Sequence, residues 1–126
     1  MPFRVYPTIF EVIEAHRLLI EEFGGLDGIR DRGLLESAVF RPRSGYYADI
    51  IEEAAALMES LTNNQAFVDG NKRVAFAMTD TMLRANGYFL DVDALEAHRL
   101  MMEATKKNEF RFPWIRDWIA SIIRLT

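Results

Sequence analysis

Apolar residues recur at helical spacing through almost the whole chain, and this periodicity limits the possible folds more than any other feature. Thr8 and Glu11 have the spacing of a capping box before the first apolar stripe, and Gly24 and Gly25 follow its end. The stripe itself consists of Ile9, Ile13, His16, Ile20 and Phe23. Asp31 then precedes a shorter stripe as an N-cap would. The first third of the chain therefore predicts two helices.

Four further helices are predicted, and one of them is apolar on almost every side. It begins near Asn71, directly after the loop 65–70. A helix with such a small number of polar side chains is typical of the buried centre of a bundle. The others are predicted over 50–63, from Asp93 to about Lys106, and from Pro113 onward, with 88–92 briefly extended. We expect an all-α fold, a compact bundle of about six helices around this central helix, in a single domain over residues 1–126.

The composition excludes several kinds of chemistry. There is no cysteine, which removes thiol nucleophiles and cysteine zinc sites, and two histidines are too few for a histidine-rich metal site. The 15 basic and 19 acidic residues give a net charge of −4, which makes nucleic acid an unfavoured partner. The chain lacks a signal-peptide pattern and an apolar run of the ~20 residues that span a membrane. We therefore expect a soluble cytoplasmic domain with no membrane partner.

The loop before the central helix is the candidate site. Gly70 permits a left-handed backbone, and the helix that follows presents free N–H groups and a dipole that favour phosphate. Lys72 and Arg73 add positive charge, and Asn71 can donate from its side-chain amide. Asp69 is an oxygen ligand suited to hold Mg²⁺ against phosphate oxygens. These residue types predict a site for a phosphate compound and a metal ion.

A simpler interpretation of the same loop also fits the sequence. Asp-Gly-Asn is a common turn, Asn71 is a frequent helix cap, and Lys72 and Arg73 would then be solvated side chains. In either case Phe67, which is flanked by polar residues, is expected to anchor the loop in the core. Physical chemistry alone leaves both interpretations open.

The run Phe67-Val68-Asp69-Gly70-Asn71-Lys72-Arg73 resembles the signature of the Fic/Doc (Fido) family, His-x-Phe-x-Asp/Glu-Gly-Asn-Gly/Lys-Arg. The lysine at position 72 is similar to the death-on-curing (Doc) toxin branch, since Fic adenylyltransferases usually have glycine there. The resemblance continues through residues 22–31, 34–38, 41–42 and 86–88. It covers roughly residues 5–92, and the last third of the chain matches only in its helical pattern.

This resemblance implies a six-helix bundle that uses Mg·ATP to modify a protein hydroxyl group. Doc-type members are toxins that phosphorylate elongation factor Tu and arrest translation, and a cognate antitoxin neutralises them. Fic relatives transfer an adenylyl group instead. Carried over by position, Asp69 would hold the metal, and the ATP phosphates would be bound by Gly70, Asn71, Lys72 and Arg73. The catalytic set would comprise Asp69, Lys72, Arg73 and the residue at position 65.

At position 65 this chain has glutamine where the family has its catalytic histidine. That histidine takes the proton of the attacking hydroxyl, which requires a pKa near neutrality, and the amide of Gln65 cannot do so. Because general-base catalysis contributes about 10²–10⁴-fold, we expect weak transfer at most. Gln65 is either an introduced or selected inactivating change, or a natural one that leaves a non-catalytic nucleotide- or antitoxin-binding protein or a protein with another base.

Neither histidine is an obvious substitute for the missing base. His16 lies on the apolar stripe of the first helix, where we expect a satisfied, partly buried side chain, with a role near the loop as the alternative. His98 is expected on a surface or partly buried face of the fifth helix. Asp80 and Arg84, four residues apart on the central helix, are expected to pair with each other.

Two aromatic regions could bind a partner. Arg41 and Arg43, with the tyrosines at 46 and 47, lie where the family has a substrate-aligning flap, so they bind a target or antitoxin or else form a solvated loop. Trp114 and Trp118, four residues apart, are expected in the core; if exposed, they would form a groove for an antitoxin helix.

Overall fold

A computed structural model describes residues 3–126; Met1 and Pro2, with which the predicted domain and its N-terminal segment begin, lie outside the described residues. In chain order the elements are α1 (Ile9–Phe23), α2 (Arg32–Phe40), the 3₁₀ turn η1 (Arg41–Arg43), α3 (Ile50–Asn63), α4 (Asn71–Ala85), β1 (Tyr88–Leu90), α5 (Ala94–Lys106), α6 (Phe112–Ile122) and β2 (Ile123–Leu125). The predicted all-α bundle of six helices is confirmed.

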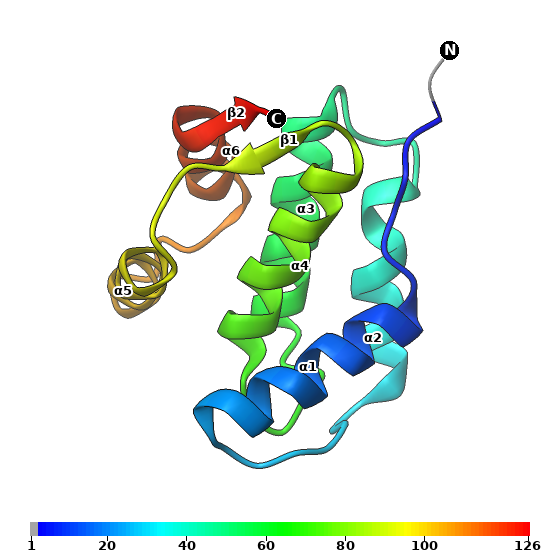
Figure 1. Ribbon diagram of the computed structural model, residues 1–126, viewed down its shortest axis with the longest axis vertical. Coiled ribbons are helices and arrows are strands. Elements are labelled where there is room, and N and C mark those ends of the chain that lie inside the picture. Colours follow the sequence, from blue (N-terminus) through cyan, green and yellow to red (C-terminus); the bar gives the residue numbers. More distant parts are fainter. Residues whose placement is uncertain (1–2) are drawn as a thin grey trace.

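α3 and α4 form an antiparallel pair at the centre, and the other helices surround them (Figure 1). α1 crosses the end of the pair where α4 begins, and α5 stands beside that same end. The predicted central helix shares its place with α3, which buries more side chains than α4 does. Ala54, Ala55 and Ala56 are all fully buried, because small side chains let two helices approach closely.

The predicted caps fix where the helices begin. Thr8 Oγ1 accepts a hydrogen bond from the Glu11 N–H at 3.2 Å, and Glu11 Oε1 accepts one from the Thr8 N–H at 2.9 Å. The Asp31 carboxylate accepts from the Leu34 N–H at 3.0 Å, and that of Asp93 caps α5. These bonds satisfy N–H groups that have no partner within the helix.

The C-terminal end differs from the sequence interpretation in one respect. β1 lies within the stretch predicted to be extended, but it pairs antiparallel with β2, which was not predicted. Ile123 was expected on the apolar face of the last helix, and instead its backbone is extended (φ −71°, ψ 137°) and it pairs with Leu90. A three-residue strand at the end of an amphipathic helix carries too little pattern of its own to be recognised.

The predicted packing of α4 and α6 is confirmed. Trp114 and Trp118 are partly buried against the core, with ring centroids 5.4 Å apart. Asp80 accepts from Arg84 at 2.8 Å and also from the Leu90 N–H at 2.9 Å, so this pair joins α4 to β1. Over residues 3–126, no helix has both the length and the hydropathy that crossing a membrane requires.

The connection from α2 to α3 is held by its arginines. Arg41 donates to Tyr47 Oη at 2.6 Å and to Glu59 Oε1 at 2.7 Å, and Arg43 donates to the Pro7 carbonyl at 3.1 Å. The solvated-loop interpretation is therefore wrong for Arg41, whereas Arg43 is exposed and donates one such bond. Binding of a target or antitoxin by either arginine stays a prediction. Tyr46, which is 85% exposed, remains available to a partner.

Candidate functional site

The loop between α3 and α4 makes a left-handed turn at Gly70, as predicted. Gly70 has φ +76° and is the N-cap of α4. A Cβ atom there would lie 3.3 Å from Ile20 Cδ1 and 3.4 Å from His16 Nε2. Glycine is thus favoured by the backbone conformation, and the close approach of α1 leaves little room for a larger residue.

α1 supports this loop through a buried histidine. The Nε2–H of His16 donates to the Asp69 carbonyl oxygen at 2.7 Å, and the imidazole is only 2% exposed. Its ring stacks on Phe67 with centroids 3.8 Å apart and planes 8° apart. The expectation of a satisfied buried residue is confirmed for His16, and its contacts also place it against the loop. Phe67 is buried, which confirms it as the anchor.

The side chain of Asn71 is engaged within the loop. Its Oδ1 accepts from the Phe67 N–H at 3.1 Å, and its Nδ2 donates to the Phe67 carbonyl at 3.0 Å. The sequence assigned this amide to phosphate, whereas the structure gives it the task of closing the loop. What Asn71 offers a ligand is therefore chiefly its backbone N–H group.

Residues 28–31 brace the loop from the other side, which the sequence reasoning missed. The Val68 N–H donates to the Gly28 carbonyl at 3.0 Å, and the Arg30 N–H donates to the Ala66 carbonyl at 2.7 Å. The Arg30 side chain also donates from Nε to the Gln65 carbonyl at 2.6 Å. The sequence around Arg30 does not indicate that its side chain will contact the loop, because Arg30 and Gln65 are 35 positions apart.

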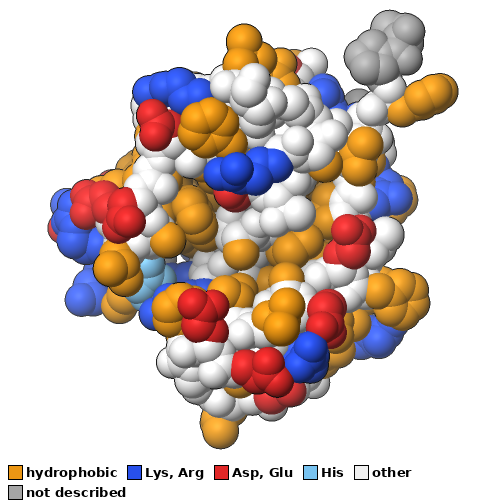
Figure 2. Space-filling view, in the orientation of Figure 1, with side chains coloured by type: hydrophobic (Ala, Val, Ile, Leu, Met, Phe, Trp, Pro, Cys, Tyr) orange, Lys and Arg blue, Asp and Glu red, His pale blue; other side chains and the backbone are white. Residues whose placement is uncertain are grey.

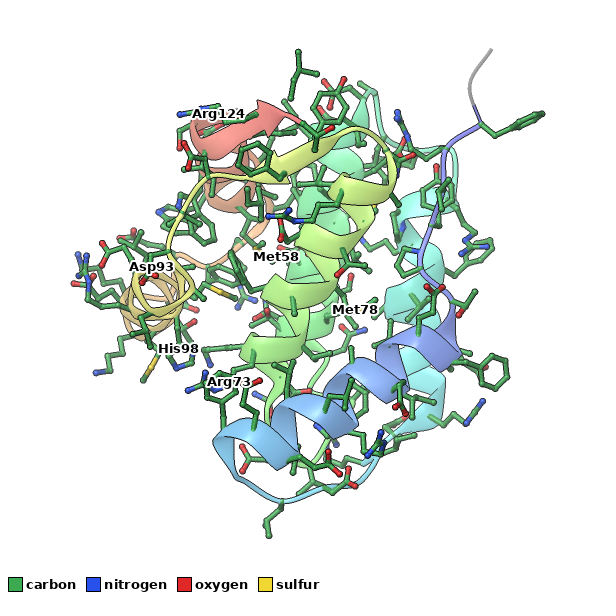
Figure 3. The ribbon with its side chains drawn as sticks, in the orientation of Figure 1. Met58, Arg73, Met78, Asp93, His98 and Arg124 are labelled. Atoms are coloured by element: carbon green, nitrogen blue, oxygen red, sulfur yellow. The ribbon has the colours of Figure 1, made fainter. Side chains whose placement is uncertain are left out.

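A cavity of about 410 Å³ opens beside the N-terminus of α4, between α1, the loop and α5. Figure 2 shows this hollow bordered by Lys or Arg side chains and a histidine, and Figure 3 labels Arg73 and His98 there. Its lining includes the predicted site residues Gln65, Asp69, Gly70, Asn71, Lys72 and Arg73. A more apolar cavity of about 320 Å³ adjoins it and shares Leu19, Lys72, Arg73 and His98.

Positive charge and free donors converge on this cavity. Among residues 3–126, the side chains of Lys72 and Arg73 have no carboxylate within ion-pair distance. The Arg73 guanidinium lies 4.1 Å from the centroid of the Phe23 ring, which holds it by a cation–π contact. The backbone N–H groups of residues 71–73 find no acceptor in the described part of the chain. This combination suits an anion such as a polyphosphate.

The carboxylate of Asp69 lies at the rim of the cavity. Its Oδ1 accepts from the Gly70 N–H at 2.9 Å, and its Oδ2 accepts from the Leu26 N–H at 3.3 Å. No cluster of three or more His, Asp or Glu side chains that could hold a metal occurs within residues 3–126. The donor set therefore fits Mg²⁺ bound by one carboxylate together with phosphate oxygens and water, not a closed protein site.

Gln65 occupies an uncommon backbone conformation. Its φ is +50°, in the left-handed region, and its side chain is exposed at the cavity. Such a conformation costs a non-glycine residue about 1–2 kcal/mol. Strained positions of this kind concentrate at functional sites, where the surrounding structure holds them in place. The hydrogen bond from Arg30 does so here.

His98 is the site residue that the sequence did not reveal. It projects from α5, is partly buried and lines both cavities. Burial, then the positive charges of Arg73 and Lys72, lower its pKa below the ordinary value for histidine. Residues 73 and 98 belong to different helices, and helical periodicity does not predict which faces of two helices meet.

This geometry defines a helical domain in which a loop and the start of a central helix present uncommitted N–H donors and positive charge to a cavity. The sequence profile of the Fic/DOC family matches residues 6–83. "Toxin Doc" of Mycolicibacterium smegmatis is 43% identical over 93 residues, which cover 68% of this chain and 72% of that protein. "Protein kinase doc" of Escherichia phage P1 is 33% identical over 81 residues, covering 61% of this chain and 64% of the relative. The chain belongs to the Fic/DOC family, in its Doc toxin branch.

Proposed function

We propose that this chain is a toxin that binds Mg·ATP in the cavity at the start of α4 and transfers the γ-phosphoryl group to a serine or threonine hydroxyl of a protein. One observation carries the proposal: free backbone N–H groups, Lys72 and Arg73 converge on one cavity with the Asp69 carboxylate at its rim. In phosphoryl transfer the protein contributes mainly positioning and stabilisation of negative charge, and this arrangement offers both.

Each residue has a task that follows from its chemistry. The N–H groups at the start of α4 and the Lys72 ammonium would bind phosphate oxygens, and the Arg73 fork, held over Phe23, would bind them from the side of the second cavity. Asp69 would hold Mg²⁺, and the bound metal withdraws charge from the phosphoryl group. His16 would keep Asp69 in place through its carbonyl.

Transfer is proposed to be slow because position 65 carries glutamine. Gln65 can accept a hydrogen bond from the substrate hydroxyl through its amide oxygen and so orient it, but it cannot take the proton. General-base assistance is worth about 10²–10⁴-fold, which sets the largest deficit expected against a histidine at the same position.

The substrate and partners are proposed by extension from the Doc relatives. A translation factor, elongation factor Tu in particular, is the proposed protein substrate, a cognate antitoxin is the proposed partner, and the cytoplasm is the proposed location. Support comes from the names of the two relatives, one a toxin and the other a protein kinase. Lys72 also favours this chemistry over adenylyl transfer, because the Fic adenylyltransferases that the loop resembles usually have glycine there.

Restoring the base tests the proposal. Gln65→His should transfer label from γ-labelled ATP to purified elongation factor Tu and arrest growth of cells that express it. The same variant with Asp69→Ala and Lys72→Ala is the negative control. Label transferred from α-labelled ATP would indicate an adenylyltransferase instead. No toxicity and no transfer from Gln65→His would refute the kinase.

Gln65 favours a second candidate function, a protein that binds nucleotide or antitoxin without catalysis. Calorimetric titration with Mg·ATP separates the two when it is combined with the transfer assay. Tight binding by both this chain and Gln65→His, with no transfer by either, would establish the non-catalytic function. Loss of binding in Asp69→Ala, Lys72→Ala identifies the loop as the nucleotide site.

A further inference from the structure

His98 faces the candidate site from the helix opposite the loop. It lies on α5 at the boundary of the two cavities, and Arg73 meets it there from α4 (Figure 3). The imidazole makes no hydrogen bond with any residue between 3 and 126, unlike that of His16. A partly buried histidine with both ring nitrogens uncommitted is open to a ligand in the cavity.

The other groups that line the first cavity are poorly suited to accept a proton. Gln65 carries an amide, and Lys72 and Arg73 are cations. Asp69 already accepts backbone hydrogen bonds on both oxygens, and it is the proposed metal ligand. Within the described lining, His98 is the remaining side chain able to take a proton near neutral pH.

The charges around His98 favour its neutral form. The charged residues that line the cavities with it are Lys72 and Arg73 in both, Asp69 in the first and Asp80 in the second. The α1 residues that line the cavities carry no charge. Burial and the two cations lower the pKa of His98 and so favour its unprotonated imidazole. An unprotonated imidazole has the lone pair that a general base requires.

We propose that His98 accepts the proton of the substrate hydroxyl in this chain, in place of the histidine that the family carries at position 65. The proposal rests on the proposed function. As the hydroxyl oxygen forms a bond to the γ-phosphorus, its proton passes to the free ring nitrogen of His98. The bond from the γ-phosphorus to the bridging oxygen breaks, and ADP leaves. His98 then releases the proton to solvent, which the neighbouring cations favour.

Four proteins test this with purified elongation factor Tu and γ-labelled ATP: this chain, His98→Gln, Gln65→His, and the double variant. We expect His98→Gln to lower the transfer rate of this chain by about 10²-fold, the low end of general-base assistance. In the Gln65→His background the same change should have little effect on the transfer rate, because the histidine at 65 then takes the proton. Leu95→Gln is the matched control, since Leu95 is on the same helix, 73% exposed and outside both cavities.

The outcomes separate this proposal from the function on which it rests. Equal rates for this chain and His98→Gln, or no transfer by this chain while Gln65→His is active, would overturn the role of His98 and leave the kinase intact. No transfer by either this chain or Gln65→His would overturn both. A transfer rate that rises with pH through the pKa of His98, and loses that dependence in His98→Gln, supports the proposal.

A measurement without turnover checks the position of His98. The chain has two histidines, so the imidazole proton signals in an NMR titration can be assigned with His98→Gln. The pKa of His98 should lie below the usual value of about 6.5 and rise when inorganic pyrophosphate is added, because an anion in the cavity stabilises the imidazolium. A His98 signal that does not respond to pyrophosphate would place it outside the site and overturn the proposal.

Discussion

The two ends of α4 differ in whether their polar groups find partners within the chain. At the C-terminal end, Asn86 accepts from the Val5 N–H at 2.8 Å and donates to the carbonyls of Val5 at 2.8 Å and Met82 at 2.7 Å. Nearby, Asp80 pairs with Arg84. At the N-terminal end, the N–H groups of residues 71–73 have no acceptor among residues 3–126, and in the same part of the chain Lys72 and Arg73 have no carboxylate within ion-pair distance.

Within one helix, the polar groups at the C-terminal end hold the fold together, and those at the N-terminal end are open to a ligand. A helix terminus normally has its N–H or carbonyl groups satisfied by caps, side chains or water. The C-terminal end of α4 follows that rule with bonds from Asn86, which fasten it to the N-terminal segment. The N-terminal end is held by its loop but leaves its donors directed at a cavity. Changes at the first end should affect stability, and changes at the second should affect binding.

The largest expected effect is on nucleotide binding at the open end. Lys72→Ala should weaken Mg·ATP affinity by about 10–150-fold, since a hydrogen bond to a charged group contributes about 1.5–3 kcal/mol. Its free energy of unfolding should change by less than about 0.5 kcal/mol. Calorimetry and urea unfolding measure the two quantities. Lys106→Ala, an exposed lysine at the end of α5, is the matched control and should bind normally.

The closed end should respond in the opposite way. Asn86→Ala removes three hydrogen bonds and should lower the free energy of unfolding by about 2 kcal/mol, within the range for unsatisfied polar groups. Mg·ATP affinity of the folded variant should stay within about twofold, because Asn86 lies at the far end of the helix. A large loss of affinity without loss of stability would show that the two ends are not independent.

What the sequence could predict follows the same division. The local signals identified both ends of α4, because Gly70 needs a left-handed backbone and Asn86-Gly87 cannot continue the helix. They also identified the cations of the loop. They misjudged Asn71, since an amide suited to phosphate is equally suited to the backbone of Phe67.

The features that the sequence did not reveal depend on contacts between distant segments. Arg30 reaches Gln65 across 35 positions, and β2 exists because it pairs with β1. His98 enters the site because α5 packs beside the start of α4, and an isolated histidine on an amphipathic helix carries no sign of that. Local chemistry was thus predictable from the residues, whereas the partners of each group required the fold.

His16 tests whether the open end depends on its support from α1. His16→Phe keeps an aromatic ring against Phe67 but loses the hydrogen bond to the Asp69 carbonyl, which should cost about 1 kcal/mol of unfolding free energy. Because Asp69 is then less well fixed, ATP affinity should fall more in the presence of Mg²⁺ than in its absence. Calorimetry with and without Mg²⁺ gives this difference, and equal losses would mean that His16 supports the fold but not the metal ligand.

The smallest expected effect concerns the strained backbone at Gln65, the residue just before the buried part of the loop. Gln65→Asn keeps a side-chain amide, and asparagine tolerates the left-handed region better than glutamine does, so the free energy of unfolding should rise by about 0.5 kcal/mol. The bond from Arg30 goes to the backbone carbonyl and is unaffected by the change. Urea unfolding measures the gain, and a loss of stability would mean that the glutamine side chain makes a contact that offsets its strain. Unchanged affinity for Mg·ATP would then separate this position, where the substrate hydroxyl is proposed to bind, from the donors of α4 that are proposed to bind the phosphates.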